Sequence, residues 1–223
     1  MSIAAVLWDM DGTLVDSEPV WGRVQIEVLT ELGGHWTDED SLQLIGSSLP
    51  AAMQVWLAAV PPGVIEADAL AERIYSEVLR GLKESVEFRP GARELLEALN
   101  AEGTPCALVS ASYRTMIDAV LSHFPPGLFD VVVAGDEVVN GKPHPEPYLT
   151  AARELDVDPA DCVVIEDTLN GSASGLAAGA FVVAVPQWVP IPPEPRRAVL
   201  DTLAGVTPAD LRKLALERRG PGR

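Results

Sequence analysis

The chain begins with an apolar segment that leads directly into two aspartates, Ile3-Ala4-Ala5-Val6-Leu7-Trp8-Asp9-Met10-Asp11-Gly12-Thr13. Ile3 to Trp8 form a short apolar run of the kind that makes a buried strand. Two carboxylates, Asp9 and Asp11, follow directly at the carboxyl end of this run. Core packing does not explain them, because two such charges held close together need a cation or another counter-charge. The pattern therefore predicts a strand that ends in a chemical site, with Asp9 as a nucleophile and Asp11 as an acid/base.

Four further apolar runs, rich in Val, Leu or Ile and without clean alternation, continue the pattern along the chain. With the first run they are Ile3–Trp8, Pro105–Val109, Val131–Ala134, Cys162–Ile165 and Phe181–Val185. Such runs suit strands that are covered on both faces of a parallel sheet. Helical patterns lie between the later runs, for example the i, i+3, i+4, i+7 spacing of apolar residues from Ala92 to Leu99. This alternation predicts an open α/β sheet whose ligands bind at the carboxyl ends of the strands.

Residues 16–87 interrupt the alternation, because they contain helical patterns and no credible strand. The helical patterns are Val20–Leu32, Ala51–Val60 and Ile65–Leu82, with a helix start at Thr37 to Asp40. We therefore expect an inserted helical cap domain at 16–87 and an α/β core domain made of residues 1–15 and 88–223.

The tail after Val185 begins with a proline-rich stretch, Pro190–Pro195, which we interpret as an exposed loop rather than a dimer contact. Ala198–Leu203 predicts a sixth edge element, and Ala209–Glu217 predicts a closing helix. These segments complete the expected core domain.

Composition limits the possible partners. The 223 residues carry a formal net charge of −17, which excludes a general nucleic-acid binder, because phosphate neutralisation needs a basic stripe. The same charge disfavours an anionic membrane surface, and no run approaches the ~20 apolar residues of a membrane span. Cys106 and Cys162 lie in or beside apolar runs and fit small buried residues better than a disulfide or metal pair. We expect a cytoplasmic monomer without nucleic-acid or membrane partners.

Polar residues of chemical interest fall at the carboxyl ends of four expected strands. They are Asp9 with Asp11, Ser110, Lys142, and Glu166 with Asp167. Each has a plain structural explanation: a helix N-cap for the serine, a solvated loop for the lysine, and an acidic helix start for the last pair. These explanations do not account for the arrival of all four at one edge of one sheet, which predicts a shared site.

Four motifs carry these residues. They are Trp-Asp-Met-Asp-Gly-Thr-Leu-Val-Asp-Ser-Glu-Pro (8–19), Val-Ser-Ala-Ser (109–112), Gly-Lys-Pro-His-Pro-Glu-Pro-Tyr (141–148) and Glu-Asp-Thr-Leu-Asn-Gly (166–171). Together they resemble the haloacid dehalogenase superfamily, in its phosphatase and β-phosphoglucomutase-like branch with a helical (C1-type) cap. The resemblance implies a Rossmann-like, doubly wound parallel sheet of order 5-4-1-2-3, counted along the chain. It also implies Mg²⁺ dependence and an aspartyl-phosphate intermediate.

The metal residues follow from the same resemblance. Mg²⁺ is expected on Asp9, on the backbone carbonyl of Asp11 and on Asp167, since it prefers a few hard oxygens and keeps waters. Glu166 is expected to orient a metal-bound water rather than to bind the metal itself. Lys142 would hold phosphoryl oxygens together with the Asp9 carboxylate.

The remaining phosphoryl oxygens would be held by Ser110 and by the backbone N–H groups of Met10, Asp11 and Ala111. Asp9 would attack phosphorus. Asp11 would first protonate the leaving alkoxide and then deprotonate the attacking water, so that one group acts as acid and then as base.

Asp11 separates the activities known in the family. Dehalogenases and phosphonate-cleaving relatives usually lack this acid, so its presence disfavours both activities. The phosphonate-cleaving relatives also use a cap lysine, and the only lysine of the expected cap is Lys83, near its end. β-Phosphoglucomutase-like isomerases keep the acid and are the main alternative. Their cap typically presents a His and an Arg near the positions of Trp21 and Leu49, which favours a phosphatase here. A non-catalytic phosphate-binding regulator is the remaining alternative.

The residues after the first motif point to the substrate. Asp16 to Trp21 resembles the corresponding stretch of phosphatases that act on deoxyhexose or hexitol phosphates. We therefore expect a small phosphorylated sugar or polyol, with Glu18 hydrogen-bonding a sugar hydroxyl. Glu18 also suits a helix-start acid followed by proline, and Trp21 also suits a core aromatic of the cap.

Overall fold

The computed structural model describes residues 3–44 and 49–218. The chain divides into two compact units, which are described separately below. The core unit consists of Met1–Asp16 and Glu87–Arg223, and the helical unit consists of Ser17–Val86.

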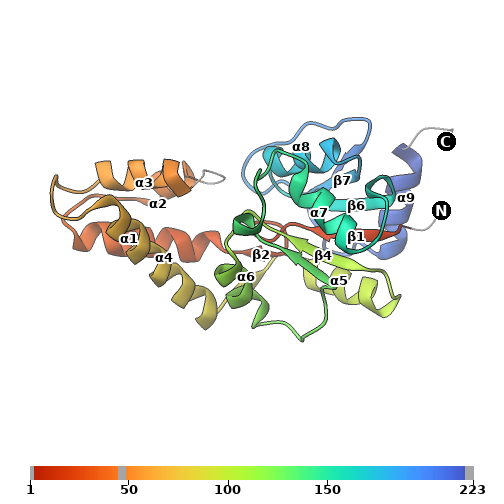
Figure 1. Cartoon of the computed structure of the whole chain (residues 1–223), viewed down its shortest axis with the longest axis horizontal. Helices are drawn as coiled ribbons and strands as arrows, with labels where there is room; N and C mark the ends of the chain where they lie inside the picture. Colours follow the sequence, from red (N-terminus) through yellow and green to blue (C-terminus); the bar gives the residue numbers. More distant parts are fainter. Residues whose placement is uncertain (1–2, 45–48, 219–223) are drawn as a thin grey trace. The chain divides into compact units, whose positions relative to one another are not determined.

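A six-stranded parallel sheet forms the centre of the core unit, in the order β5-β4-β1-β6-β7-β8 (Figure 1). The strands are β1 (Ala5–Trp8), β4 (Cys106–Val109), β5 (Val131–Val133), β6 (Cys162–Glu166), β7 (Phe181–Ala184) and β8 (Arg197–Val199). The first five lie in the predicted order. The stated order 5-4-1-2-3 was incomplete, because β8 pairs in parallel with β7 and extends the sheet. The sequence marked this strand only weakly, since it has three residues and begins with an arginine.

Arg197 explains how the proline-rich loop reaches the sheet edge. Its side chain is buried, its Nε donates to the carbonyl oxygen of Pro192 at 2.9 Å, and its Nη2 donates to Glu194 Oε1 at 2.6 Å. These donors satisfy backbone and side-chain acceptors of Pro190–Pro195, as a buried arginine requires. Part of this stretch is therefore fixed against the fold by an arginine.

Helices cover both faces of the sheet. They are α5 (Ala92–Ala101), α6 (Arg114–Leu121), α7 (Glu146–Glu154), α8 (Leu169–Ala177) and α9 (Pro208–Arg218), with short 3₁₀ turns η1 (Gly135–Glu137) and η2 (Pro159–Asp161). Leu7, Val109 and Val164 belong to the apolar cluster that includes Tyr148 and Ala151 of α7. Figure 1 shows α7 and α8 side by side on one side of the sheet, while α5 packs against α9. The strands are therefore buried, which explains their continuous apolar runs.

Over the described residues of the helical unit, 17–44 and 49–86, the chain forms four helices. They are α1 (Glu18–Glu31), α2 (Asp38–Leu42), α3 (Leu49–Ala58) and α4 (Ala67–Glu84). Leu70, Ile74 and Val78 lie buried along one side of α4, as their spacing predicts. Thr37 is the N-cap of α2, and its hydroxyl and the Asp40 carboxylate form a reciprocal capping box.

The prediction that residues 16–87 contain no strand was wrong at both ends. β2 (Val15–Asp16) pairs in antiparallel fashion with β3 (Glu87–Phe88). A pair of two-residue strands leaves too few positions for an alternation pattern, so no local pattern predicted them. These strands belong to the core unit and flank the insertion.

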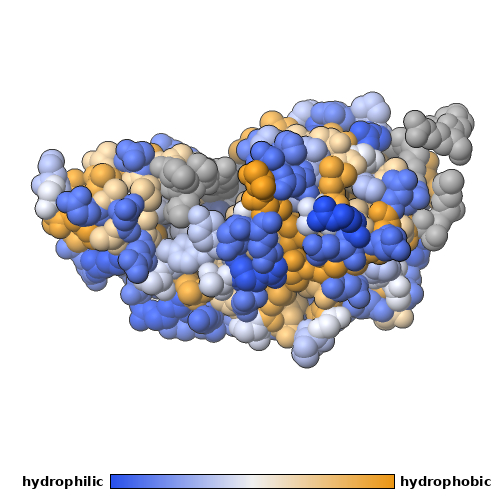
Figure 2. Space-filling model, in the orientation of Figure 1, coloured by the Kyte–Doolittle hydropathy of each residue, from blue (hydrophilic) through white to orange (hydrophobic). Residues whose placement is uncertain are grey.

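Hydrophilic residues cover most of the face shown in Figure 2, which fits the net charge of −17. Apolar surface is visible between them on the core unit. Across residues 3–44 and 49–218, no helix has the length and apolar content needed to cross a membrane.

Candidate active site

The register of three adjacent strands brings the predicted residues to one edge of the sheet. Trp8 of β1 lies opposite Leu108 of β4 and Ile165 of β6. The backbone N–H of Asp9 donates to the carbonyl oxygen of Ile165 at 3.0 Å. Because all three strands run in parallel, the residues after their last positions leave the sheet side by side. Asp9, Ser110 and Glu166 therefore meet at this edge.

The turn after Asp9 requires glycine at position 12. The N–H groups of Leu14 and Val15 both donate to the carbonyl oxygen of Met10, at 2.9 and 3.0 Å. Gly12 has φ +82°, and a Cβ there would lie 2.1 Å from Asp167 Oδ2. A side chain would thus be strained and would displace a carboxylate of the site.

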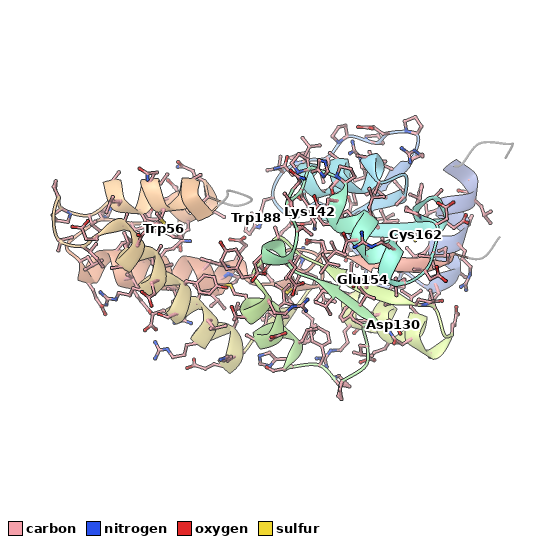
Figure 3. All side chains as sticks on the ribbon, viewed as in Figure 1. Trp56, Asp130, Lys142, Glu154, Cys162 and Trp188 are labelled. Atoms are coloured by element: carbon pink, nitrogen blue, oxygen red, sulfur yellow. The ribbon has the colours of Figure 1, made fainter. Side chains whose placement is uncertain are left out.

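Lys142 joins two carboxylates from different strands. Its Nζ donates to Asp9 Oδ1 at 2.6 Å, to Glu166 Oε1 at 2.6 Å and to the carbonyl oxygen of Val109 at 2.9 Å. The Lys142 side chain is 7% exposed, and those of Asp9 and Glu166 are 10% and 1% exposed. Figure 3 places Lys142 at the end of the core unit opposite Cys162, the first residue of β6. All three Nζ donors therefore have an acceptor, as a buried ammonium requires.

Glu166 is fully engaged by hydrogen-bond donors. Its Oε1 accepts from Lys142 and from the Tyr148 hydroxyl, the latter at 2.9 Å. Its Oε2 accepts from the Thr168 hydroxyl at 3.0 Å and from the Thr168 N–H at 3.2 Å. A Cβ at position 171 would lie 1.6 Å from Oε1, so Gly171 lets α8 approach this carboxylate. The four donors leave Glu166 better suited to orient neighbouring groups than to bind a metal directly.

Asp11 contacts the carboxyl end of β4. Its Oδ2 accepts from the Ser112 hydroxyl at 2.7 Å and from the Ser110 hydroxyl at 3.3 Å. Ser110 Oγ in turn accepts from the Ser112 N–H at 3.0 Å. Ala111 lies exposed between the two serines, and Met10 is buried between the two aspartates. The segment around Ser110 therefore meets the turn that carries Asp11.

Burial and like charges raise the pKa values of two aspartates. Burial and the charge of Glu166 raise the pKa of Asp9 to about 7, against the attraction of Lys142. Burial and the charge of Asp9 raise the pKa of Asp167 to about 9. Burial disfavours the Lys142 cation, but Asp9 and Glu166 outweigh it and hold its pKa well above the usual range. The cluster thus carries more negative charge than one lysine balances.

The residues present fit a divalent cation. Carboxylate oxygens of Asp9, Glu166 and Asp167 lie within 4.8 Å of one another, and all three residues are buried. Asp167 Oδ1 accepts from the Thr13 hydroxyl at 3.3 Å, which fixes the carboxylate. The hard carboxylate oxygens of Asp9 and Asp167, with Glu166 beside them, suit Mg²⁺, and a bound cation would lower the raised pKa values of both aspartates.

Three predicted residues lie in the helical unit. Glu18 is the first residue of α1. Trp21 stacks on Trp56 with ring centroids 6.5 Å apart, so the cap-core explanation accounts for it. The side chain of Leu49 lies outside what the structure describes. The substrate role of Glu18 stays a prediction.

Ser112 and Tyr148 are among the groups that touch the predicted residues and were not predicted from the sequence. Ser112 donates to Asp11, and Tyr148 donates to Glu166. Both lie inside the quoted motifs, so their positions were available. Their roles could not be predicted, because a hydroxyl three residues beyond the end of β4 or at the third position of α7 carries no sign of its partner across the sheet.

Comparisons with known proteins agree with this geometry. A family model described as haloacid dehalogenase-like hydrolase matches residues 3–179. Hexitol phosphatase B of Escherichia coli (strain K12) is 32% identical over 186 residues, which cover 82% of this chain and 84% of that protein. The crystal structure of CbbY from Rhodobacter sphaeroides in complex with phosphate matches with a TM-score of 0.78 at 26% identity, over 94% of this chain and 99% of that chain. β-Phosphoglucomutase from Clostridium difficile shares the fold, with a TM-score of 0.79 at 23% identity over 96% and 98% of the two chains.

Proposed function

The chain belongs to the haloacid dehalogenase-like hydrolases, and we propose that it is a Mg²⁺-dependent phosphatase of a small phosphate monoester. The observation that carries the proposal is the buried contact of Lys142 Nζ with both Asp9 and Glu166, at 2.6 Å each. A cation held between carboxylates at a sheet edge can neutralise a dianionic substrate where a purely acidic cluster would repel it.

Asp9 is the proposed nucleophile. Its carboxylate oxygen attacks phosphorus in line with the ester oxygen, a P–O bond to Asp9 forms, and the bond to the leaving oxygen breaks. Lys142 holds the Asp9 carboxylate by its Oδ1, which orients the group and stabilises the charge that gathers on the phosphoryl oxygens. The product of this half-reaction is an aspartyl phosphate.

Asp11 is the proposed acid and then base. As a carboxylic acid it gives its proton to the leaving alkoxide, and as a carboxylate it takes a proton from the water that attacks the aspartyl phosphate. The bond between Asp9 and phosphorus breaks in this second step, which releases phosphate. Ser110 and Ser112, which contact Asp11 at 3.3 and 2.7 Å, hold its carboxylate between the two steps.

Asp9, the Asp11 carbonyl and Asp167 are the proposed ligands of Mg²⁺, with Glu166 outside the coordination shell. When bound, the cation supplies charge neutralisation for the phosphoryl oxygens. Ser110 and the backbone N–H groups of Met10, Asp11 and Ala111 are the proposed donors to the remaining oxygens.

The proposed substrate is a sugar or polyol phosphate. The supporting observation is the similarity to hexitol phosphatase B over 82% of this chain. Glu18 is the proposed partner of a substrate hydroxyl. A cytoplasmic monomer with an inserted helical cap completes the proposal.

Phosphate release from a panel of sugar, polyol and short-acid phosphates, with Mg²⁺ and with EDTA, tests the proposal. Asp9→Asn is the control, because it keeps the shape of the side chain and removes the nucleophilic carboxylate. We expect metal-dependent release by the native enzyme, loss of release in Asp9→Asn, and the highest kcat/KM on the proposed substrate class.

Absence of release from the whole panel and from p-nitrophenyl phosphate would contradict a phosphatase. Interconversion of glucose phosphate isomers by the same preparation would then identify a β-phosphoglucomutase-like isomerase. Phosphate and Mg²⁺ binding without any turnover would identify a non-catalytic regulator.

A further inference from the structure

Gln187 lies beside the acidic cluster for a reason of strand register. Glu166 of β6 lies opposite Ala184 of β7, and the Val185 N–H donates to the Glu166 carbonyl oxygen at 2.7 Å. The chain after β7 therefore leaves the sheet next to Asp167. Gln187 follows Ala184 by three residues and belongs to none of the four motifs.

The orientation of the Gln187 amide is fixed by a carboxylate. Its Nε2 donates to Asp16 Oδ2 at 3.2 Å, and Arg89 Nη1 lies 3.8 Å from the same oxygen. A carboxylate only accepts hydrogen bonds, so it faces the NH₂ group and not the amide oxygen. Gln187 Oε1 must therefore point away from Asp16.

Gln187 Oε1 faces the space beside Gly12. A Cβ built on Gly12 would lie 3.3 Å from Gln187 Oε1 and 2.1 Å from Asp167 Oδ2. Both oxygens thus lie close to Gly12, on the side where any other residue would carry its Cβ. Among the described residues, Gln187 Oε1 is buried and has no hydrogen-bond partner. A buried acceptor of this kind needs a donor, and the adjacent carboxylate offers none.

We propose that Gln187 is a positioning residue for the divalent cation of the site, whose retained water donates a hydrogen bond to Gln187 Oε1. The proposal rests on the proposed Mg²⁺ site at Asp9 and Asp167. Mg²⁺ keeps several of its waters when a protein binds it, and each such water carries protons that need acceptors. Gln187 supplies one acceptor from outside the coordination shell, and Asp16 holds the amide in the productive orientation.

Direct measurement of cation affinity tests this inference without reference to turnover. Isothermal titration with MgCl₂, and Mn²⁺ titration followed by electron paramagnetic resonance, would be performed on the full chain without substrate. Gln187→Leu should weaken binding about 10- to 100-fold, as the loss of a group outside the coordination shell commonly does. Gln54→Leu is the matched control, because Gln54 is an exposed glutamine of α3 in the helical unit, and its affinity should equal that of the native chain.

Gln187→Asn provides a second, milder variant if Gln187→Leu does not fold. The shorter side chain withdraws the amide by one methylene, so we expect about a fivefold to tenfold loss of affinity. The rise in unfolding midpoint on adding Mg²⁺ should shrink in the same order, since stabilisation follows the ratio of cation concentration to its dissociation constant.

Three outcomes overturn the inference in distinguishable ways. If the native chain binds no cation, the proposed metal site fails and Gln187 loses its role with it. If the native chain and both Gln187 variants bind Mg²⁺ equally, Gln187 has no role while the metal site stands. If cation affinity is unchanged but KM rises, Gln187 contacts the substrate instead.

Discussion

In the helical unit, Arg23 and Glu27 form an ion pair whose side chains are 49% and 54% exposed. In the core unit, Lys142 pairs with Asp9 and Glu166, and the three side chains are 7%, 10% and 1% exposed. Water screens the charges of the exposed pair, whereas the charges of the buried group must be balanced by one another. A buried excess of carboxylates is costly unless a function maintains it. The buried group around Lys142 therefore indicates a functional site, whereas the exposed pair does not.

Lys142→Met should give the largest effect of any change in either unit. It leaves the Asp9 and Glu166 carboxylates buried without the lysine ammonium, so phosphate release should fall by about a thousandfold or more. The free energy of unfolding should drop by about 3 kcal/mol, as when one partner of a buried pair is removed. Phosphate release measures the activity and urea unfolding measures the stability, both at pH 8.

Lys213→Met is the matched control, since the Lys213 side chain is 72% exposed in a weak pair with Glu217. Its activity and stability should match those of the native chain. If the two lysine variants behaved alike, the contrast between buried and exposed pairs would be wrong.

Without metal, the core unit should lose stability as pH rises. The pKa of Asp9 is about 7 and that of Asp167 about 9, both above the ordinary 3.8 of the unfolded chain. The folded state therefore holds protons that the unfolded state releases, so the contribution is complete below about pH 4 and is lost as pH rises through both folded values. The urea midpoint in EDTA should fall between pH 5 and pH 9, and an unchanged midpoint would contradict the account.

Mg²⁺ affinity should increase as pH rises, whereas the stability without metal should decrease. The carboxylates must lose their protons before they bind the cation, so the dissociation constant should decrease about tenfold per pH unit between pH 7 and pH 9. Titration calorimetry at several pH values measures this slope. A pH-independent constant over that range would place the cation elsewhere.

Tyr148→Phe should give an intermediate effect. It removes one of the two donors on Glu166 Oε1 and keeps the buried ring in place. We expect kcat to fall about tenfold with little change in KM, because the hydroxyl positions Glu166 and does not touch substrate. Tyr75→Phe, at a half-buried tyrosine of α4, is the control. A change in KM alone would assign the Tyr148 hydroxyl to substrate binding.

The smallest effect belongs to the exposed pair of the helical unit. A double-mutant cycle of Arg23→Met and Glu27→Gln should give a coupling energy of about 0.5 kcal/mol or less. Urea unfolding of the four proteins measures it. A coupling of several kcal/mol would show that exposure does not separate the two classes of ion pair.

The sequence predicted most of the sheet and of the candidate site, and it missed details for physical reasons. Short apolar runs identified five strands, and the carboxyl-end rule placed Asp9 and Lys142 at one edge. The sixth edge element was predicted at Ala198–Leu203, but β8 spans Arg197–Val199, because a strand that begins with a charged residue has no apolar run to mark its start. Gln187 and Tyr148 were not predicted, since their partners are reached across strands and no local spacing reports such contacts.

Asp9 is proposed to carry the phosphoryl group during turnover. This role is tested most directly by acid quenching of a single turnover of p-nitrophenyl phosphate, followed by mass spectrometry of the intact chain and of its peptides. The account predicts a transient adduct with the mass of one phosphoryl group on the peptide that contains Asp9, absent from Asp9→Asn. Turnover by the native chain without an adduct, or an adduct that persists in Asp9→Asn, would contradict it.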